Sequence, residues 1–193
     1  MEKIYLIHAR AQSGKDTAAV CIKNYYEREG KKVMIIAFAD YVKFVLDKYY
    51  NTPHERTVEY RTRIQQFATD QVRHQTPNFW AEVVAKLIYA TREDFDIVVI
   101  PDWRFYNELA VTHFFMQNEL DSGETKLIKV LITREDNNST DKMTEEQRAH
   151  QSECELDNYE NFDYNIINKT NYLSDFYKQI EAMIKETEND SRE

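Results

Sequence analysis

The sequence predicts a three-layer α/β fold, in which helices cover both faces of a five-stranded parallel sheet. Five short segments are rich in apolar residues, which is typical of strands buried on both faces. Segments with helical periodicity separate them along the chain, and this alternation is typical of a parallel sheet. At 193 residues the chain has the length of one domain, and its 42% of hydrophobic residues exclude a disordered chain.

The expected strands and helices alternate along this domain. Strands are expected at residues 3–8, 32–38, 95–100, 126–133 and 163–167. Helices are expected between Gly14 and Gly30 and at residues 41–50, 55–73, 78–92, 107–119 and 171–186. The domain thus spans residues 1–187, and residues 188–193 are expected to form a solvated acidic tail.

The charge balance limits the kinds of partner. Asp and Glu outnumber Lys and Arg by 34 to 25, so the net charge is −9. Nucleic-acid polymers and anionic membranes require a basic face, and no stretch approaches the about 18 apolar residues of a membrane span. Two cysteines do not form a disulfide framework. We therefore expect a cytoplasmic protein without nucleic-acid or membrane partners, which holds any anionic ligand with a local cluster of cations.

The most informative segment, ARAQSGKDT, joins the first strand to the first helix. A phosphate-binding loop in this position has glycine, four residues, and then Gly-Lys-Ser/Thr. Its backbone N–H groups surround the phosphates while the lysine neutralises their charge. Gly14 and Lys15 fit this pattern, whereas Ala9 replaces the first glycine and Asp16 occupies the hydroxyl position, with Thr17 next.

This loop predicts a P-loop NTPase fold that binds ATP and Mg²⁺. The expected nucleotide-binding residues are Ser13, Gly14, Lys15, Asp16 and Thr17. Asp16 is the candidate Mg²⁺ ligand, because hard cations prefer oxygen ligands. The alternatives are a helix start capped by Ser13, with Lys15 in solvent, and an Asp16 that merely stabilises the helix N-terminus.

Several motifs, in order, resemble the phage-type deoxynucleoside monophosphate kinases. SGKDTAA is similar to the phosphate loop of that family, in which Asp takes the usual Ser/Thr position. FADYVK resembles its F-A-D-x-x-K, QQFATD followed by Arg73 and Trp80 resembles its Q-x-x-G-T-D…R…W, and DWRFYNE resembles its D-x-R-F-x-N-E. Arg134, the segment HQSE and Asn168 complete a resemblance over about residues 3–185. Ala9 and Ala68 stand where the family usually has glycine.

The resemblance implies an acceptor site on the helices of about residues 40–93. The substrate-binding residues that it implies are Asp40, Lys43, Arg73, Trp80, Asp102, Arg104 and Glu108. It also implies that Asn168 lies near the adenine. A plain exposed helical lysine is the alternative for Lys43, and a core position is the alternative for Trp80.

Asp102 and Arg104 directly follow the third expected strand. Open α/β sheets bind ligands at the carboxyl ends of their strands. An Asp there suits Mg²⁺ and an Arg suits phosphate oxygens, so we expect a metal-organising Asp102 and a catalytic Arg104. A salt bridge between the two side chains in a turn is the alternative.

The polar segment at about residues 134–150 is expected to be a lid. Arg134 and Arg148 lie near its ends, where they would close over the phosphates as catalytic residues beside Lys15. The alternative is a surface loop with two ordinary arginines. His150 and Cys154 are too few for a zinc site, and we interpret His150 as a helix-end or lid-base residue.

Together these features predict ATP·Mg²⁺-dependent phosphoryl transfer to a (deoxy)nucleoside monophosphate. The partners are then ATP and a small phosphorylated acceptor, and a homodimer is expected from the resemblance alone. Two alternatives stay open at this point. One is a P-loop kinase of another small acceptor, such as dephospho-coenzyme A, and the other is a regulator that binds ATP without transferring phosphate.

Overall fold

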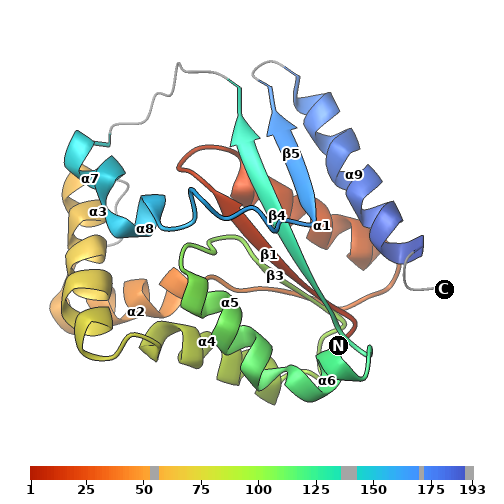
Figure 1. Cartoon of the computed structure of the whole chain (residues 1–193), viewed down its shortest axis with the longest axis horizontal. Coiled ribbons are helices and arrows are strands. Elements are labelled where there is room, and N and C mark those ends of the chain that lie inside the picture. The colour runs from red at the N-terminus through yellow and green to blue at the C-terminus, as the bar shows by residue number, and fades with distance from the viewer. Residues whose placement is uncertain (53–56, 136–142, 170–171, 190–193) are drawn as a thin grey trace.

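The computed structural model describes residues 1–52, 57–135, 143–169 and 172–189. Its centre is one parallel sheet with the strand order β2-β3-β1-β4-β5 (Figure 1). The strands are β1 (Lys3–Ala9), β2 (Val33–Ile35), β3 (Ile97–Ile100), β4 (Lys126–Arg134) and β5 (Tyr164–Asn168). The predicted three-layer α/β fold is confirmed.

Helices cover both faces of the sheet (Figure 1). The first and last helices, α1 (Lys15–Arg28) and α9 (Leu173–Asn189), pack on one face, and α4 (Phe79–Ala90) and α5 (Tyr106–Phe115) pack on the other. Alternation along β1 explains this arrangement. Tyr5 and Ile7 belong to the core under α1 and α9, whereas Ile4 and Leu6 belong to the core under α4 and α5.

The second predicted strand is too long, because a helix begins within it. β2 ends at Ile35, and α2 (Phe38–Tyr50) starts at Phe38. Asp102, beyond β3, explains this start: its two carboxylate oxygens accept the backbone N–H groups of Phe38 at 2.8 Å and of Ala39 at 2.9 Å. These N–H groups lack intrahelical acceptors, so a carboxylate placed there stabilises the helix start.

Two predicted helices are each divided. Residues 57–73 form α3 (Val58–Gln65) and a π-helix, η1 (Gln66–Arg73). Residues 106–121 form α5 and α6 (Gln117–Asp121). A π-helix is rare and is frequent at functional sites. The spacing of apolar residues does not distinguish a π-helix from an α-helix. The sequence therefore could not predict where η1 lies, and only the structure shows it.

The segment predicted as a lid contains one short helix that sequence periodicity missed, α7 (Glu145–Ala149), and a second short helix, α8 (Gln151–Cys154), follows it directly. Residues 136–142 of that segment lie outside the described residues. Gln147 of α7 donates to the Val58 carbonyl at 2.9 Å and to the Thr62 hydroxyl at 2.8 Å, so α7 is docked on α3. His150 Nδ1 accepts the Ser152 N–H at 3.2 Å, which confirms His150 as a helix-end residue.

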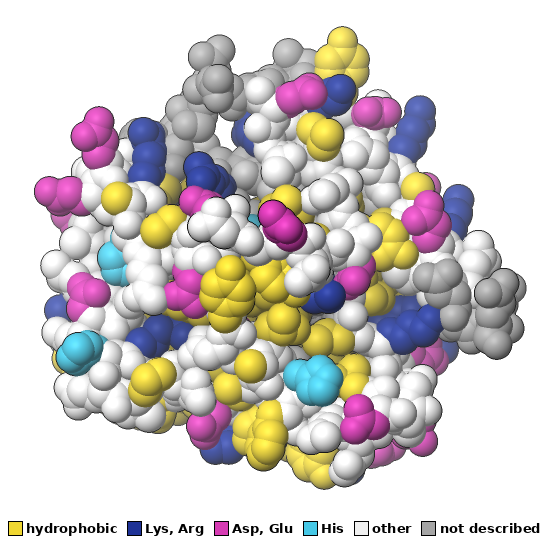
Figure 2. Space-filling view, in the orientation of Figure 1, with side chains coloured by type: hydrophobic (Ala, Val, Ile, Leu, Met, Phe, Trp, Pro, Cys, Tyr) yellow, Lys and Arg dark blue, Asp and Glu magenta, His cyan; other side chains and the backbone are white. Residues whose placement is uncertain are grey.

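Aromatic rings hold the chain that follows α8. The Trp103 ring is fully buried, and its centroid lies 5.0 Å from that of Tyr159 and 5.6 Å from that of Phe162. These ring contacts fix the chain after α8, and with it α8, over the carboxyl edge of the sheet. Figure 2 shows one face of the molecule, where hydrophobic side chains gather in the middle, with basic and acidic side chains around them.

The C-terminal helix extends beyond the expected end of the domain. Residue 188 was expected in a solvated tail, yet α9 continues to Asn189. Glu188 accepts hydrogen bonds from Lys3 Nζ at 2.7 Å and from the Tyr26 hydroxyl at 2.8 Å. Lys3 is only 3% exposed and needs this counter-charge. Residues 190–193 lie outside the described residues, and none of the described helices is both long and apolar enough to cross a membrane.

Candidate active site

The loop between β1 and α1 contains a sharp turn that only glycine accommodates. Gly14 has a φ of 103°, and Gln12 also has a positive φ of 60°. A Cβ atom on Gly14 would lie 2.7 Å from Asn168 Nδ2 and 3.2 Å from Phe176 Cζ. Gly14 is therefore required both for its backbone conformation and for the close approach of β5 and α9.

Side chains from two neighbouring strands hold the backbone of this loop. Asn168 at the end of β5 donates to the Ser13 carbonyl at 3.0 Å, and Arg134 at the end of β4 donates to the Gln12 carbonyl at 3.0 Å. Asn168 and Arg134 are thus supports of the loop; their predicted contacts with nucleotide stay predictions.

The start of α1 is suited to an anion. Its N-cap is Gly14, and no side chain of the described chain caps it, so Ser13 does not fill the capping role considered above. Uncapped N–H groups and the helix dipole favour negative charge at this point. A glycine turn that leads into uncapped N–H groups fits a phosphate group.

Lys15 and Asp16 begin α1 with opposite charges. Lys15 Nζ lies 3.1 Å from Asp16 Oδ2, and the Asp16 side chain is 76% exposed. Thr17 lines a groove between α1 and α9 that Asp16 also lines. The described residues contain no group of three His, Cys, Asp or Glu side chains that would hold a metal by themselves. Asp16 fits a Mg²⁺ ion that takes its other ligands from phosphates and water.

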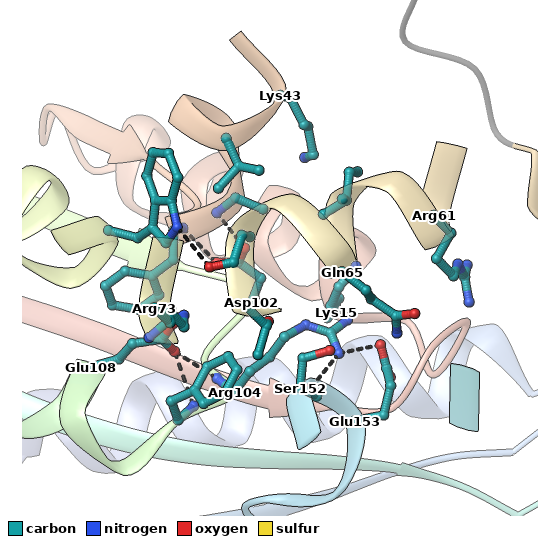
Figure 3. A pocket seen from close by; sticks show the side chains of 18 residues that line it. Lys15, Lys43, Arg61, Gln65, Arg73, Asp102, Arg104, Glu108, Ser152 and Glu153 are labelled. Atoms are coloured by element: carbon teal, nitrogen blue, oxygen red, sulfur yellow. Dashed lines mark hydrogen bonds and ion pairs between the residues drawn. The ribbon is translucent and has the colours of Figure 1, made fainter. Parts of the chain in front are cut away.

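A cavity of about 250 Å³ lies beside Lys15 (Figure 3). Loops and helices far apart in the sequence contribute cations to its wall. The cations that line it are Lys15, Lys43, Arg61, Arg73 and Arg104. Phe38, Val42, Ile64 and Trp80 form its apolar part. The arrangement is a positively charged pocket with one apolar wall, at the carboxyl edge of the sheet.

Two buried carboxylates organise this pocket from beneath. Asp102 uses both oxygens at the start of α2, and burial raises its pKa. Glu108 accepts the backbone N–H groups of Arg104 at 2.8 Å and Phe105 at 3.1 Å, and pairs through its other oxygen with Arg73. Burial raises the pKa of Glu108 to about 7, although Arg73 opposes the shift.

Arg73 is held from several sides. Its guanidinium carbon lies 3.9 Å from the Phe105 ring centroid, and Nη1 donates to Asn107 Oδ1 at 3.3 Å. Together with the Glu108 ion pair, these contacts fix a rigid cation at the cavity wall. A preorganised guanidinium binds phosphate oxygens without further ordering cost.

The ion pair of Arg104 differs from the Asp102 salt bridge considered above. Arg104 Nη1 lies 2.5 Å from Glu153 Oε1 and donates to the Ser152 carbonyl at 2.8 Å (Figure 3). Burial alone would lower the pKa of Arg104, but Glu153, Asp102 and Glu108 raise it above its ordinary value. The guanidinium is therefore charged at every accessible pH.

The other predicted acceptor residues take different positions. Trp80 is 2% exposed and donates to the Ala68 carbonyl at 3.1 Å, so it belongs to the core and also lines the cavity. Asp40 accepts the Ala37 N–H at 2.8 Å at the start of α2 and does not line the cavity, whereas Lys43, 3.5 Å from Asp40 Oδ1, does.

Arg134 and Arg148 lie at a second cavity of about 450 Å³. Ser13 lines this second cavity, whereas Lys15 lines the first, so the phosphate loop passes between the two. Glu153 lines both. The structure thus brings seven predicted residues together in the first cavity: Lys15, Lys43, Arg73, Trp80, Asp102, Arg104 and Glu108.

The sequence analysis gave no role to five polar residues at the first cavity: Arg61, Gln65, Thr69, Ser152 and Glu153. Arg61 lies four residues before Gln65, a spacing that places both on one face of a helix. Gln65, Ser152 and Glu153 stand within the motifs quoted above. The helical spacing on α3 and the quoted motifs are the signals from which these residues could have been found.

Comparisons with known proteins support the fold. No family model matches the chain, and no curated protein matches its sequence. Among solved structures, it is similar to the APS kinase of Mycobacterium tuberculosis, with a TM-score of 0.52, 8% identity and 97% of each chain covered. Dephospho-CoA kinase from Campylobacter jejuni has a TM-score of 0.47 and 17% identity, with 97% of this chain and 98% of that chain covered. The chain therefore has the fold of a P-loop kinase, while its resemblance to the phage-type enzymes stays a prediction.

Replacing Gly14 by Ala should destabilise the protein more than replacing Gly30 by Ala. Both glycines have positive φ, so both variants incur a left-handed strain of about 1–2 kcal/mol. A Cβ on Gly30 meets nothing within 4 Å, whereas one on Gly14 meets Asn168 and Phe176. Urea unfolding of the two variants should separate them by about 1 kcal/mol or more. Equal losses would contradict the close packing behind the loop.

Replacing Glu108 by Gln should remove a pH dependence of stability. The pKa of Glu108 is about 7 in the fold against an ordinary 4.5, so the folded state retains a proton that the unfolded state has lost between these values. The free energy of unfolding therefore falls as pH rises from 4.5 to 7, by up to about 3 kcal/mol, and this contribution is constant above pH 8.

Urea unfolding of wild type and Glu108→Gln across pH 4.5 to 8 measures this contribution as the difference between the two proteins. The exposed Glu145 of α7 supplies a control, since Glu145→Gln should give a difference that hardly changes with pH. A pH-independent difference for Glu108→Gln would show that the carboxyl titrates at its ordinary pKa.

Proposed function

We propose that this protein transfers the γ-phosphoryl group of ATP·Mg²⁺ to a (deoxy)nucleoside monophosphate. One observation carries the proposal: a pocket with a cationic and an apolar wall opens directly beside Lys15 of the phosphate loop. Several cations in one pocket of a protein with a net charge of −9 suit an acceptor that already bears phosphate. The kinase fold of the chain is consistent with this chemistry, although a fold alone does not define a reaction.

The donor side of the proposal rests on the loop and on α1. The N–H groups at the start of α1 bind phosphate oxygens, and Lys15 neutralises their charge. A bound Mg²⁺ would supply positive charge that offsets the charge developing on the phosphates during transfer. Asp16 is the residue we assign to this ion, because both oxygens of Asp102 already accept N–H groups from α2. Arg134, Arg148 and Ser13 belong to the donor side, on the far side of the loop.

The acceptor side rests on the size and composition of the first cavity. Its volume of about 250 Å³ is just below the range of about 300–1,000 Å³ for ligand pockets, which favours a compact acceptor over coenzyme-sized ones. We assign the acceptor phosphate to Arg73, Arg104 and Lys43, and its base to the apolar wall at Trp80.

The transfer itself requires positioning and charge neutralisation. An anionic oxygen of the acceptor phosphate forms a bond to the γ-phosphorus while the bond to the bridging oxygen of ADP breaks, so no general base is needed. Charge spreads over the equatorial oxygens of the transferred group. Lys15 and Arg104 line the same cavity and are placed to stabilise that charge, while the apolar wall excludes competing water.

An assay of ADP release with ATP·Mg²⁺ and a panel of acceptors tests this function. The panel contains the four common deoxynucleoside monophosphates, AMP, GMP, dephospho-coenzyme A and shikimate. It also contains APS, because the chain shares its fold with an APS kinase. Turnover with at least one nucleoside monophosphate is expected. Turnover confined to another compound would reassign the acceptor, and ATP binding without any turnover would indicate a regulator.

Lys15→Ala should reduce turnover by about 100-fold or more, since it removes a cation from the transferring phosphoryl group without removing core. Lys23→Ala, on the exposed part of α1 where it pairs with Glu27, is the matched control and should keep wild-type turnover. Circular dichroism should show both variants folded. Wild-type turnover by Lys15→Ala would refute the assignment of the phosphate loop.

A further inference from the structure

Glu153 occupies an unusual place in the candidate active site. It extends from α8 into the first cavity, where its carboxylate pairs with Arg104 at 2.5 Å, and its side chain is only 10% exposed (Figure 3). Arg104 is also the cation placed next to Lys15 for the transferred phosphoryl group. An acidic side chain therefore lies against the guanidinium that the anionic substrate needs.

The two other carboxylates of the cavity have structural partners that Glu153 lacks. Asp102 is committed to the backbone of α2, and Glu108 to the backbone before α5 and to Arg73. Among the residues that the structure describes, the Glu153 carboxylate has one polar contact, the ion pair with Arg104. Breaking it does not uncap a helix, so this pair is the one that a ligand can exchange.

The surroundings of Glu153 allow such an exchange. Glu153 lines the second cavity as well as the first, so a carboxylate displaced from Arg104 has solvent-accessible space beside Arg148. The Ser152 carbonyl continues to accept from Arg104 at 2.8 Å and would keep the guanidinium in place. Like charges at one guanidinium repel, so a phosphate oxygen and the Glu153 carboxylate compete for it.

We propose that Glu153 is an internal competitor for phosphate at Arg104, which sets the selectivity of the acceptor pocket. The pair neutralises Arg104 when the pocket is empty, so a free phosphate ion gains little by binding. A nucleoside monophosphate also buries its base against the apolar wall, and that binding energy displaces the carboxylate. This inference rests on the proposed function for its biological meaning, but the competition itself is a property of the empty pocket.

Binding of inorganic phosphate, measured by isothermal titration calorimetry, tests the competition without any turnover. Glu153→Gln should bind phosphate about tenfold more tightly than wild type, which corresponds to about 1.4 kcal/mol. Glu146→Gln is the matched control, because it removes the same charge from an exposed position of α7 and should leave phosphate affinity unchanged. A structural role for Glu153 would give the opposite sign, since damage to the pocket weakens binding.

A double-mutant cycle identifies the guanidinium involved. In an Arg104→Ala background, Glu153→Gln should produce no gain, because the competition needs Arg104. Glu153→Asp, which keeps the charge on a shorter side chain, should give a smaller gain and serves as the second variant if Glu153→Gln does not fold. Phosphate affinity that is unchanged or weaker in these folded single variants overturns the proposal, as does a gain that persists without Arg104.

Failure of this inference and failure of the proposed function are distinguishable. A gain in phosphate affinity together with no turnover on any acceptor would uphold the competition and refute the kinase. Turnover on nucleoside monophosphates with unchanged phosphate affinity in Glu153→Gln would uphold the kinase and refute the competition.

Discussion

The left-handed turn at Gly14 is the constraint on which the site depends. β5 and α9, from the far end of the chain, approach so closely that Asn168 and Phe176 leave no space for a side chain there. The same approach brings the Asn168 amide to the Ser13 carbonyl. β5 and α9, near the end of the chain, thereby fix the loop that lies near the beginning of the chain. The fixed loop places Lys15 at the first cavity and Ser13 at the second. A phosphate site made of backbone groups requires this rigidity, because its N–H groups have no side-chain freedom with which to adjust.

Buried carboxylates organise the first cavity, which Lys15 of this loop also lines. Asp102 and Glu108 each accept two backbone N–H groups at a helix start, so each fixes an element of the pocket wall. Glu108 also fixes a cation, Arg73. Such side chains are costly to bury, and their hydrogen bonds compensate for that cost. Glu153 differs because its polar contact among the described residues is with Arg104 and with no helix start, so we propose it as the carboxylate that responds to a ligand.

The sequence was sufficient for the sheet and for seven of the 18 residues that line the first cavity. Apolar runs located all five strands, and the residues after them, among them Lys15, Asp102 and Arg104, were correctly expected at one edge because parallel strands end together. The π-helix, α7 and α8 were not predictable, since short helices and helix type depend on contacts such as that of Gln147 with α3. The pairing of Arg104 with Glu153 was not predictable either, because two residues 49 positions apart show no periodic pattern that would link them. Whether Asn168 contacts nucleotide, as the resemblance implies, stays a prediction beside its observed role in the loop.

A crystal structure with a bisubstrate analogue, in which a polyphosphate chain joins two nucleosides, tests the central claim most directly. We expect the polyphosphate to run from the start of α1 past Lys15 to Arg104, with one nucleoside against the apolar wall at Trp80. We also expect that Glu153 no longer contacts Arg104 in this complex. A polyphosphate bound away from the loop, or a first cavity left empty while the analogue binds elsewhere, would contradict the assignment of this pocket as the acceptor site.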